Sequence, residues 1–155
     1  MNEMDNIKKN APYRINDENP DDDNLFEKYD NYITLENLEI YKLARQLSQL
    51  SWKAFDKLDW HDKKIMGDQF ISSIDSVGAN IAEGYRRFHY LDKIKFFYNS
   101  RASLSESTQH WLELLLERNK ISQDEFNQIK KIANALSIKL ANFIKTTYQQ
   151  KALNG

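Results

Sequence analysis

The densest polar chemistry of this 155-residue chain lies in residues 76–87, which read SVGANIAEGYRR. Asn80 and Glu83 are three positions apart there, among small and apolar residues, so on a helix their side chains are neighbours. Polar groups in such surroundings need partners. One interpretation is a pocket in which they bind a phosphate-bearing partner together with Arg86. The preferred interpretation is structural, with Glu83 pairing with a buried Arg101 or capping the N-terminus of the third helix.

Arg101, on the third predicted helix, is a second polar residue that is expected to need a partner. Arg101 falls on the seam of that helix at a position where an apolar residue is usual. A buried arginine requires an acidic partner, and Glu83 and Glu106 are the available carboxylates. We therefore expect a structural polar cluster of four residues: Asn80, Glu83, Arg101 and Glu106.

The remaining reactive side chains do not have the spacing of a catalytic or metal site. Glu106 and His110 are one helical turn apart, whereas a di-iron bundle site needs two Glu-x-x-His motifs and two further glutamates. The serines suggest no Ser-His-acid arrangement, and the four glycines are isolated rather than grouped in a phosphate-binding loop. Cysteine is absent, which excludes disulfides and thiolate ligands. We expect no catalytic residue, no metal, no cofactor and no enzymatic activity.

Long helices must position these side chains. Both prolines precede residue 21, and strong helix breakers are rare after that point. Apolar residues at helical spacing predict four helices, over residues 35–58, 62–83, 90–118 and 122–150. Asp62 is the expected N-cap of the second helix, Gly84 its left-handed C-terminal residue, and Ser122 with Glu125 a capping box on the fourth. The short connections predict an all-α, antiparallel up-down-up-down four-helix bundle.

Charge and composition divide the chain into three parts. Residues 1–34 hold nine acids and four bases, a net charge of −5, with both prolines and no helical or strand period. We interpret them as a disordered or loosely docked acidic arm. Residues 35–150 are the expected bundle, with a net positive charge, and residues 151–155 a short C-terminal tail.

The third predicted helix is apolar on more than one face. Successive helical residues are about 100° apart, so runs of consecutive apolar residues cover most of its circumference. A subunit interface is the preferred explanation, and coverage by the arm is the alternative. The residues expected in the interface are Phe96, Phe97, Tyr98, Trp111 and Leu115.

Basic residues concentrate at one end of the expected bundle. The segments 35–46, 79–96 and 139–151 meet there and carry nine bases and four acids, whereas the opposite end is neutral. His89 and Tyr90 lie among the bases, as aromatic residues do in nucleic-acid sites. The candidate nucleic-acid-binding residues are Lys42, Arg45, Arg86, Arg87, Lys93, Lys95 and Lys145. The acidic arm is attached at this end, where it either competes with an anionic partner or serves only solubility.

Three segments carry a family resemblance: residues 76–87, residues 38–44 (LEIYKLA) and residues 103–107 (SLSES). They resemble the small bacterial four-helix bundle proteins encoded in ribosomal-RNA intervening sequences. A sister group is the accessory variability determinant of diversity-generating retroelements. The resemblance spans about residues 35–150. It implies a ring-shaped homopentamer and, for the retroelement branch, binding to RNA and to a reverse transcriptase.

Two functions fit these observations. The first is an oligomeric nucleic-acid or ribonucleoprotein accessory module that uses its basic end, and its partners would be RNA or DNA and a reverse transcriptase or other protein. The second is a protein-binding scaffold without a nucleic-acid role. The chain has no run of eighteen apolar residues and no signal peptide, so we expect a cytoplasmic protein with no membrane partner.

Overall fold

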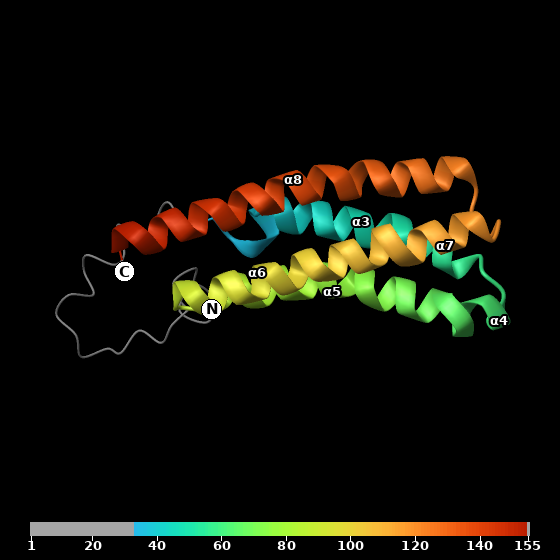
Figure 1. Ribbon diagram of the computed structural model, residues 1–155, viewed down its shortest axis with the longest axis horizontal. Helices are drawn as coiled ribbons and strands as arrows, with labels where there is room; N and C mark the ends of the chain where they lie inside the picture. Colours follow the sequence, from blue (N-terminus) through green and yellow to red (C-terminus); the bar gives the residue numbers. More distant parts are fainter. Residues whose placement is uncertain (1–32, 155) are drawn as a thin grey trace, which may run out of the picture.

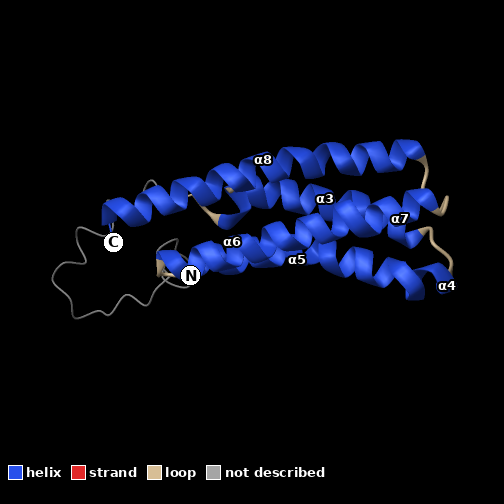
Figure 2. Cartoon of the chain, in the orientation of Figure 1, coloured by secondary structure: helices blue, strands red, loops and turns tan. Residues whose placement is uncertain are grey.

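The structure is a computed structural model that describes residues 33–154. Four helical rods make up this part of the chain (Figures 1 and 2). The first rod is preceded by a 3₁₀ turn, and the second and third rods each contain a π-helical turn. In chain order the elements are η2 (Leu35–Asn37), α3 (Glu39–Asp56), α4 (Trp60–Asp62), η3 (Lys63–Gly67), α5 (Asp68–Arg86), α6 (Tyr90–Ser105), η4 (Glu106–Trp111), α7 (Leu112–Glu117) and α8 (Gln123–Asn154). This arrangement confirms the predicted all-α four-helix bundle. The arm predicted over residues 1–34 lies almost entirely outside the described residues.

Consecutive rods run antiparallel and lie beside one another. Helix α3 packs against α5 and α8, and α6 packs against the same two helices, which closes the bundle (Figure 1). At one end, the start of α3, the end of α5, the start of α6 and the end of α8 come together (Figure 1). We call it the basic end, because the candidate nucleic-acid-binding residues come from these segments.

The interior is filled by apolar side chains from every rod. Those that are almost completely buried include Leu47, Phe70, Ile74, Phe97, Leu112, Leu115, Leu136 and Leu140. Burying one such side chain contributes about 1.5–3 kcal/mol to folding. The stripe of apolar residues therefore explains why these helices, which have polar outer faces, pack together rather than remain separate.

The third rod contains a π turn that is held by α8. A π turn adds a residue to a helix and disturbs its backbone hydrogen bonds. In η4, the hydroxyl of Thr108 donates to the carbonyl of Leu104 at 2.7 Å, and the Lys130 ammonium on α8 donates to the carbonyl of Thr108 at 3.1 Å. Lys130 also pairs with Glu113 at 3.2 Å. These contacts fix the π turn against the neighbouring helix.

The helix ends agree only in part with the sequence predictions. The capping box of α8 is confirmed, since the Ser122 amide donates to Glu125 at 2.9 Å and the Glu125 amide donates to the Ser122 hydroxyl at 3.1 Å. The N-cap of α4 is Asp59, whose carboxylate accepts the Asp62 amide at 2.8 Å, so the assignment of that cap to Asp62 was wrong. Asp62 instead pairs with Lys120 at 2.8 Å. Helix α8 continues to Asn154, past its predicted end.

Gly84 does not have the role predicted for it. It lies inside α5, and no glycine in the described part of the chain has a positive φ. A Cβ at this position would lie 2.8 Å from Cε1 of Phe97 and 3.0 Å from Cβ of Phe96. Glycine is therefore needed because α5 and α6 pack closely here, not because the helix ends in a left-handed turn.

Candidate functional site

The polar cluster predicted around Arg101 does not form. Arg101 and Glu106 are both exposed, and Glu83 pairs with Arg87, the residue that follows α5. The Asn80 amide donates to the backbone carbonyl of Ser76 at 2.8 Å. The carboxylate of Glu106 accepts a hydrogen bond from the Trp111 indole at 3.2 Å. Glu83, Asn80 and Glu106 have local partners and Arg101 is exposed, so the four residues form no buried ion pair.

The position on the seam belongs to Ser100 rather than to Arg101. Ser100 is completely buried, and its hydroxyl donates to the carbonyl of Val77 on α5 at 2.8 Å. A helix has 3.6 residues per turn, so both Ser100 and Arg101 lie close to the face of Phe97, and spacing alone allows either residue at the buried position. The smaller serine side chain allows α5 and α6 to pack closely. The signal available in the sequence was the small size of the serine.

The predicted oligomer interface divides into core and surface residues. Phe97 is 1% exposed and Leu115 is 0% exposed within the single chain, so placing these two in a subunit interface was wrong. In the run 96–98 the middle ring faces the core, because its neighbours are rotated by about 100° in either direction. Tyr98 is 43% exposed, and its ring lies 6.5 Å from that of Tyr148. Phe96 and Trp111 are half-buried.

Most of the candidate basic residues point into solvent. Six of the seven are exposed, namely Lys42, Arg45, Arg86, Arg87, Lys95 and Lys145, and Lys93 is half-buried. Among the ion pairs within residues 33–154, Arg87 pairs with Glu83 and Lys139 pairs with Glu39 at 2.8 Å, while the other six candidates take part in none. Most of the positive charge at the basic end is therefore not neutralised by the bundle.

A cavity of about 670 Å³ opens at the basic end, and we call it the basic-end cavity. It lies between the start of α6, the loop before it, the end of α8 and the residues that precede α3. Leu38, Phe97 and Phe143 supply apolar surface. Apart from Ile33, the remaining lining is aromatic or polar, and it consists of Tyr85, Phe88, His89, Tyr90, Lys93, Thr146, Thr147, Gln150 and Asn154. A volume of this size falls within the ~300–1,000 Å³ of small-molecule sites.

Lys93 brings a cation to the wall of this cavity. Its ammonium donates to the carbonyl of Tyr85 at 3.1 Å and lies 5.8 Å from the centre of the Tyr85 ring. Burial lowers the pKa of Lys93, because removing the ammonium from water disfavours its charged form. No carboxylate pairs with it within the described residues, so an anionic ligand in the cavity would relieve an uncompensated charge.

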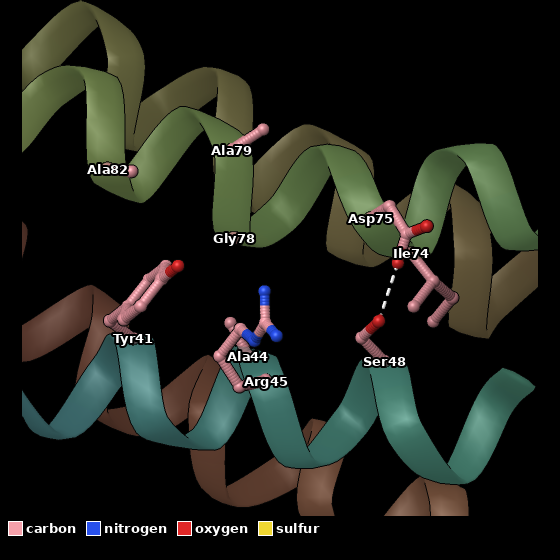
Figure 3. Close-up of a pocket in the computed structure, with 9 residues that line it drawn as sticks. All are labelled: Tyr41, Ala44, Arg45, Ser48, Ile74, Asp75, Gly78, Ala79 and Ala82. Carbon is pink, nitrogen blue, oxygen red and sulfur yellow. Dashed lines mark hydrogen bonds between the residues drawn. The ribbon is translucent and has the colours of Figure 1, made fainter. Parts of the chain in front are cut away.

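A smaller depression of about 290 Å³ lies between α3 and α5, and Figure 3 shows its lining. We call it the α3–α5 groove. Four of its lining residues are small, namely Ala44, Gly78, Ala79 and Ala82. Ser48 donates to the Asp75 carboxylate at 2.6 Å across the groove. Arg45 is in this lining and not in that of the basic-end cavity, so the structure separates it from Lys93.

Sequence reasoning found the charges of the basic end but not its cavity. Phe143, Thr147 and Gln150 follow one another at i, i+4 and i+7 on α8, which places them on one face. That spacing was the available signal. The spacing does not distinguish a cavity from the core, because Phe143 and Thr147 also occupy positions typical of the bundle interior.

The fold and this end face define a class, that of short up-down-up-down four-helix bundles with one basic end. The chain belongs to the 23S rRNA-intervening sequence protein family, whose model matches residues 36–142. Among solved structures, one that it resembles is a protein of unknown function from the S23 ribosomal protein family of Bacteroides thetaiotaomicron. The TM-score is 0.65 at 22% identity, over 72% of this chain and 99% of that one. That likeness concerns the fold alone. No curated protein matches the chain.

Two further features of the described residues bear on function. No helix between residues 33 and 154 is long and apolar enough to cross a membrane. Within the same residues, no group of three or more histidine, aspartate or glutamate side chains lies close enough together to hold a metal ion.

Proposed function

We propose that the protein is a non-enzymatic, oligomeric accessory module that binds RNA through its basic end, within a ribonucleoprotein or beside a reverse transcriptase-like partner. The observation that carries the proposal is the set of exposed cations at this end that the bundle leaves without acidic partners. Phosphates of a nucleic acid supply the missing negative charge.

The arrangement of charges argues for a binding surface rather than for a solubilising one. Lys139 and Glu39 neutralise each other along the side of the bundle, whereas Arg86 and Lys145 at the same end take part in no ion pair of the described part. Each subunit of an oligomer would repeat this end, and repeated copies would strengthen the field that attracts an anionic partner. A homopentamer, which the resemblance implies, would carry five such ends.

The salt dependence of RNA binding tests the proposal. For single strands, the logarithm of the affinity falls with the logarithm of salt concentration by about 0.7 per neutralised phosphate. Lys145→Ala should weaken binding to every RNA sequence. It should also reduce the slope of log affinity against log salt concentration by about 0.7 for each phosphate contact that is lost. Lys131→Ala, an exposed lysine near the other end of α8, is the matched control.

The assay is fluorescence anisotropy with labelled RNA, over salt from about 50 to 200 mM, where counterion release has a large effect. A wild-type protein that binds no RNA at the lowest salt would rule out the proposal. Equal losses from Lys145→Ala and Lys131→Ala would show that charge anywhere on the bundle suffices, which would also contradict a role for the basic end.

A second candidate function is a protein-binding scaffold, and the α3–α5 groove favours it. Its small residues leave room for the side chains of another polypeptide to approach the backbone. Ala79→Leu, which adds a bulky side chain to the groove, should weaken the binding of a protein partner that uses it and leave RNA binding unchanged. A partner complex that survives Ala79→Leu but is lost with Lys145→Ala would favour the first function.

A further inference from the structure

We infer that the basic-end cavity takes up one unstacked base of a single-stranded RNA, so that the protein prefers single strands to duplexes. This inference rests on the proposed function and names the kind of RNA that its site would bind. It starts from a difference between a charged surface and a cavity. A surface of cations contacts the phosphates of any nucleic acid, whereas a cavity can hold only a group that leaves the stack.

The lining of the cavity has the composition that a base requires. Tyr90 at the start of α6 and Phe143 on α8 contribute aromatic rings to the lining, and single-strand-binding proteins use aromatic rings to stack bases. Gln150 and His89 place polar groups in the same lining, where they can reach the edges of a base that is out of the stack. A drug-sized molecule fits a cavity of about 670 Å³, and a nucleotide is of that size.

The charges around the cavity match a nucleotide with its backbone outside. Lys93 lies in the lining, and its ammonium is partly removed from water. Lys145 and Lys151 lie on the same stretch of α8 as the lining residues Thr146 and Gln150, although neither lysine is part of the lining itself. This combination, an apolar and aromatic interior with cations at its edge, is complementary to a base joined to a phosphate.

A duplex cannot use the cavity without loss. Its bases are paired and stacked, and extruding one costs a few kcal/mol, which is least for a base that is already single-stranded. A duplex would therefore contact only the exposed cations. The preference for single strands is a property of the cavity, and the general affinity for RNA is a property of the charge.

The test compares two RNA probes of about 16 nucleotides, a length that covers the site size of one single-strand-binding fold. One is an unstructured oligouridylate that carries a single 2-aminopurine, and the other is a hairpin of equal length. The wild-type full-length protein should bind the single strand about tenfold more tightly than the hairpin, as expected for one stacked base. It should also quench the fluorescence of the 2-aminopurine.

Two pairs of variants separate the cavity from the charge. Tyr90→Leu removes a ring and Tyr90→Phe keeps it, so only the first should lose about tenfold in affinity for the single strand. Gln150→Glu puts a carboxylate into the lining, whereas Gln149→Glu puts the same charge one residue outside it. The first should weaken single-strand binding more than the second, and the two should affect the hairpin equally.

Equal binding of both probes, or equal behaviour within each pair of variants, would overturn the inference. The proposed function would stand in that case, provided that Lys145→Ala still weakens both probes. A wild-type protein that binds neither probe would overturn the proposed function and the inference together. Quenching that is lost in Tyr90→Leu and retained in Tyr90→Phe would support the cavity as the site of the base.

Discussion

Gly84 allows α5 and α6 to meet beside the basic end, and a methyl group there would collide with the rings of α6. Gly84→Ala should therefore destabilise the protein by about 1–3 kcal/mol, since an added Cβ would lie 2.8 Å from Phe97 in a packed core. Gly78→Ala is the control in the same helix. Its Cβ would lie 3.5 Å from that of Ala44, an ordinary contact, so the better helix propensity of alanine should make it neutral or stabilising by up to about 1 kcal/mol.

Urea unfolding followed by circular dichroism measures both changes. A Gly84→Ala protein as stable as the wild type would show that α6 can move away from α5 at no cost. That result would contradict the close packing on which one wall of the basic-end cavity depends.

Ser51 is a buried hydroxyl for which the described part of the chain offers no hydrogen-bond partner. Ser51→Ala should stabilise the protein by about 1 kcal/mol, because it removes an unsatisfied polar group from the core. Ser100→Ala should have the opposite sign, with a loss of about 1 kcal/mol, because the Ser100 hydroxyl donates to Val77 at 2.8 Å. Thermal unfolding of the two variants gives the comparison. A loss of stability in both would mean that the Ser51 hydroxyl has a partner.

At the scale of elements, the start of α8 is held by a charged capping box. Its Glu125 has a pKa lowered from the usual 4.5, first by the hydrogen bond from Lys57 and then by the backbone amide of Ser122. A carboxyl with a lower pKa in the folded state stabilises the fold fully above its unfolded pKa. The stabilisation is lost as the pH falls through the folded value. Glu125→Gln should therefore cost about 0.5–1 kcal/mol near neutral pH and nothing once the folded carboxyl is protonated.

The measurement is urea unfolding of both proteins at a series of pH values from neutral to about 3, below the usual carboxyl range. Asp124→Asn, one residue away and outside the capping box, is the control for the general effect of charge on the helix end. A cost of Glu125→Gln that stays constant down to the lowest pH would show that the charge of Glu125 is not what holds the helix end.

At the scale of the whole molecule, the exposed aromatic residues of the third rod remain candidates for contact with a second copy. Tyr98 is 43% exposed, and Trp60 at the opposite end of the bundle is 76% exposed. If the proposed homopentamer forms, light scattering should give a mass near five times 18.4 kDa. Tyr98→Glu should lower that mass, because a carboxylate would be buried without a partner. Trp60→Glu should leave it unchanged.

A wild-type protein that is monomeric at micromolar concentration would contradict the oligomer, and the proposed RNA binding would then depend on the cations of a single basic end. A mass lowered equally by both substitutions would place the interface somewhere other than the outer face of α6. Either result would leave the bundle itself unaffected, because the core residues of the third rod, Phe97 and Leu115, are buried within one chain.

Patterns within the amino-acid sequence are enough to predict the helices, their order and the concentration of positive charge at one end. Helical spacing of apolar residues, few breakers and short connections allow only an antiparallel bundle, and a capping box such as Ser122 with Glu125 depends on neighbouring residues alone. These features are local, or they follow from chain length. The three segments that carry the family resemblance can also be read from the sequence, and they fall mainly within helices that the apolar spacing predicts.

In contrast, the packing of the helices against one another sets which side chain of each run faces inward and which residues surround the basic-end cavity. A helical repeat of 3.6 residues leaves Ser100 and Arg101 equally placed after Phe97, and the close approach of α5 selected the smaller one. The same packing put Phe97 in the core and left Tyr98 outside. The basic-end cavity joins α6, α8 and the residues before α3, which are far apart in sequence, so no local pattern could reveal it.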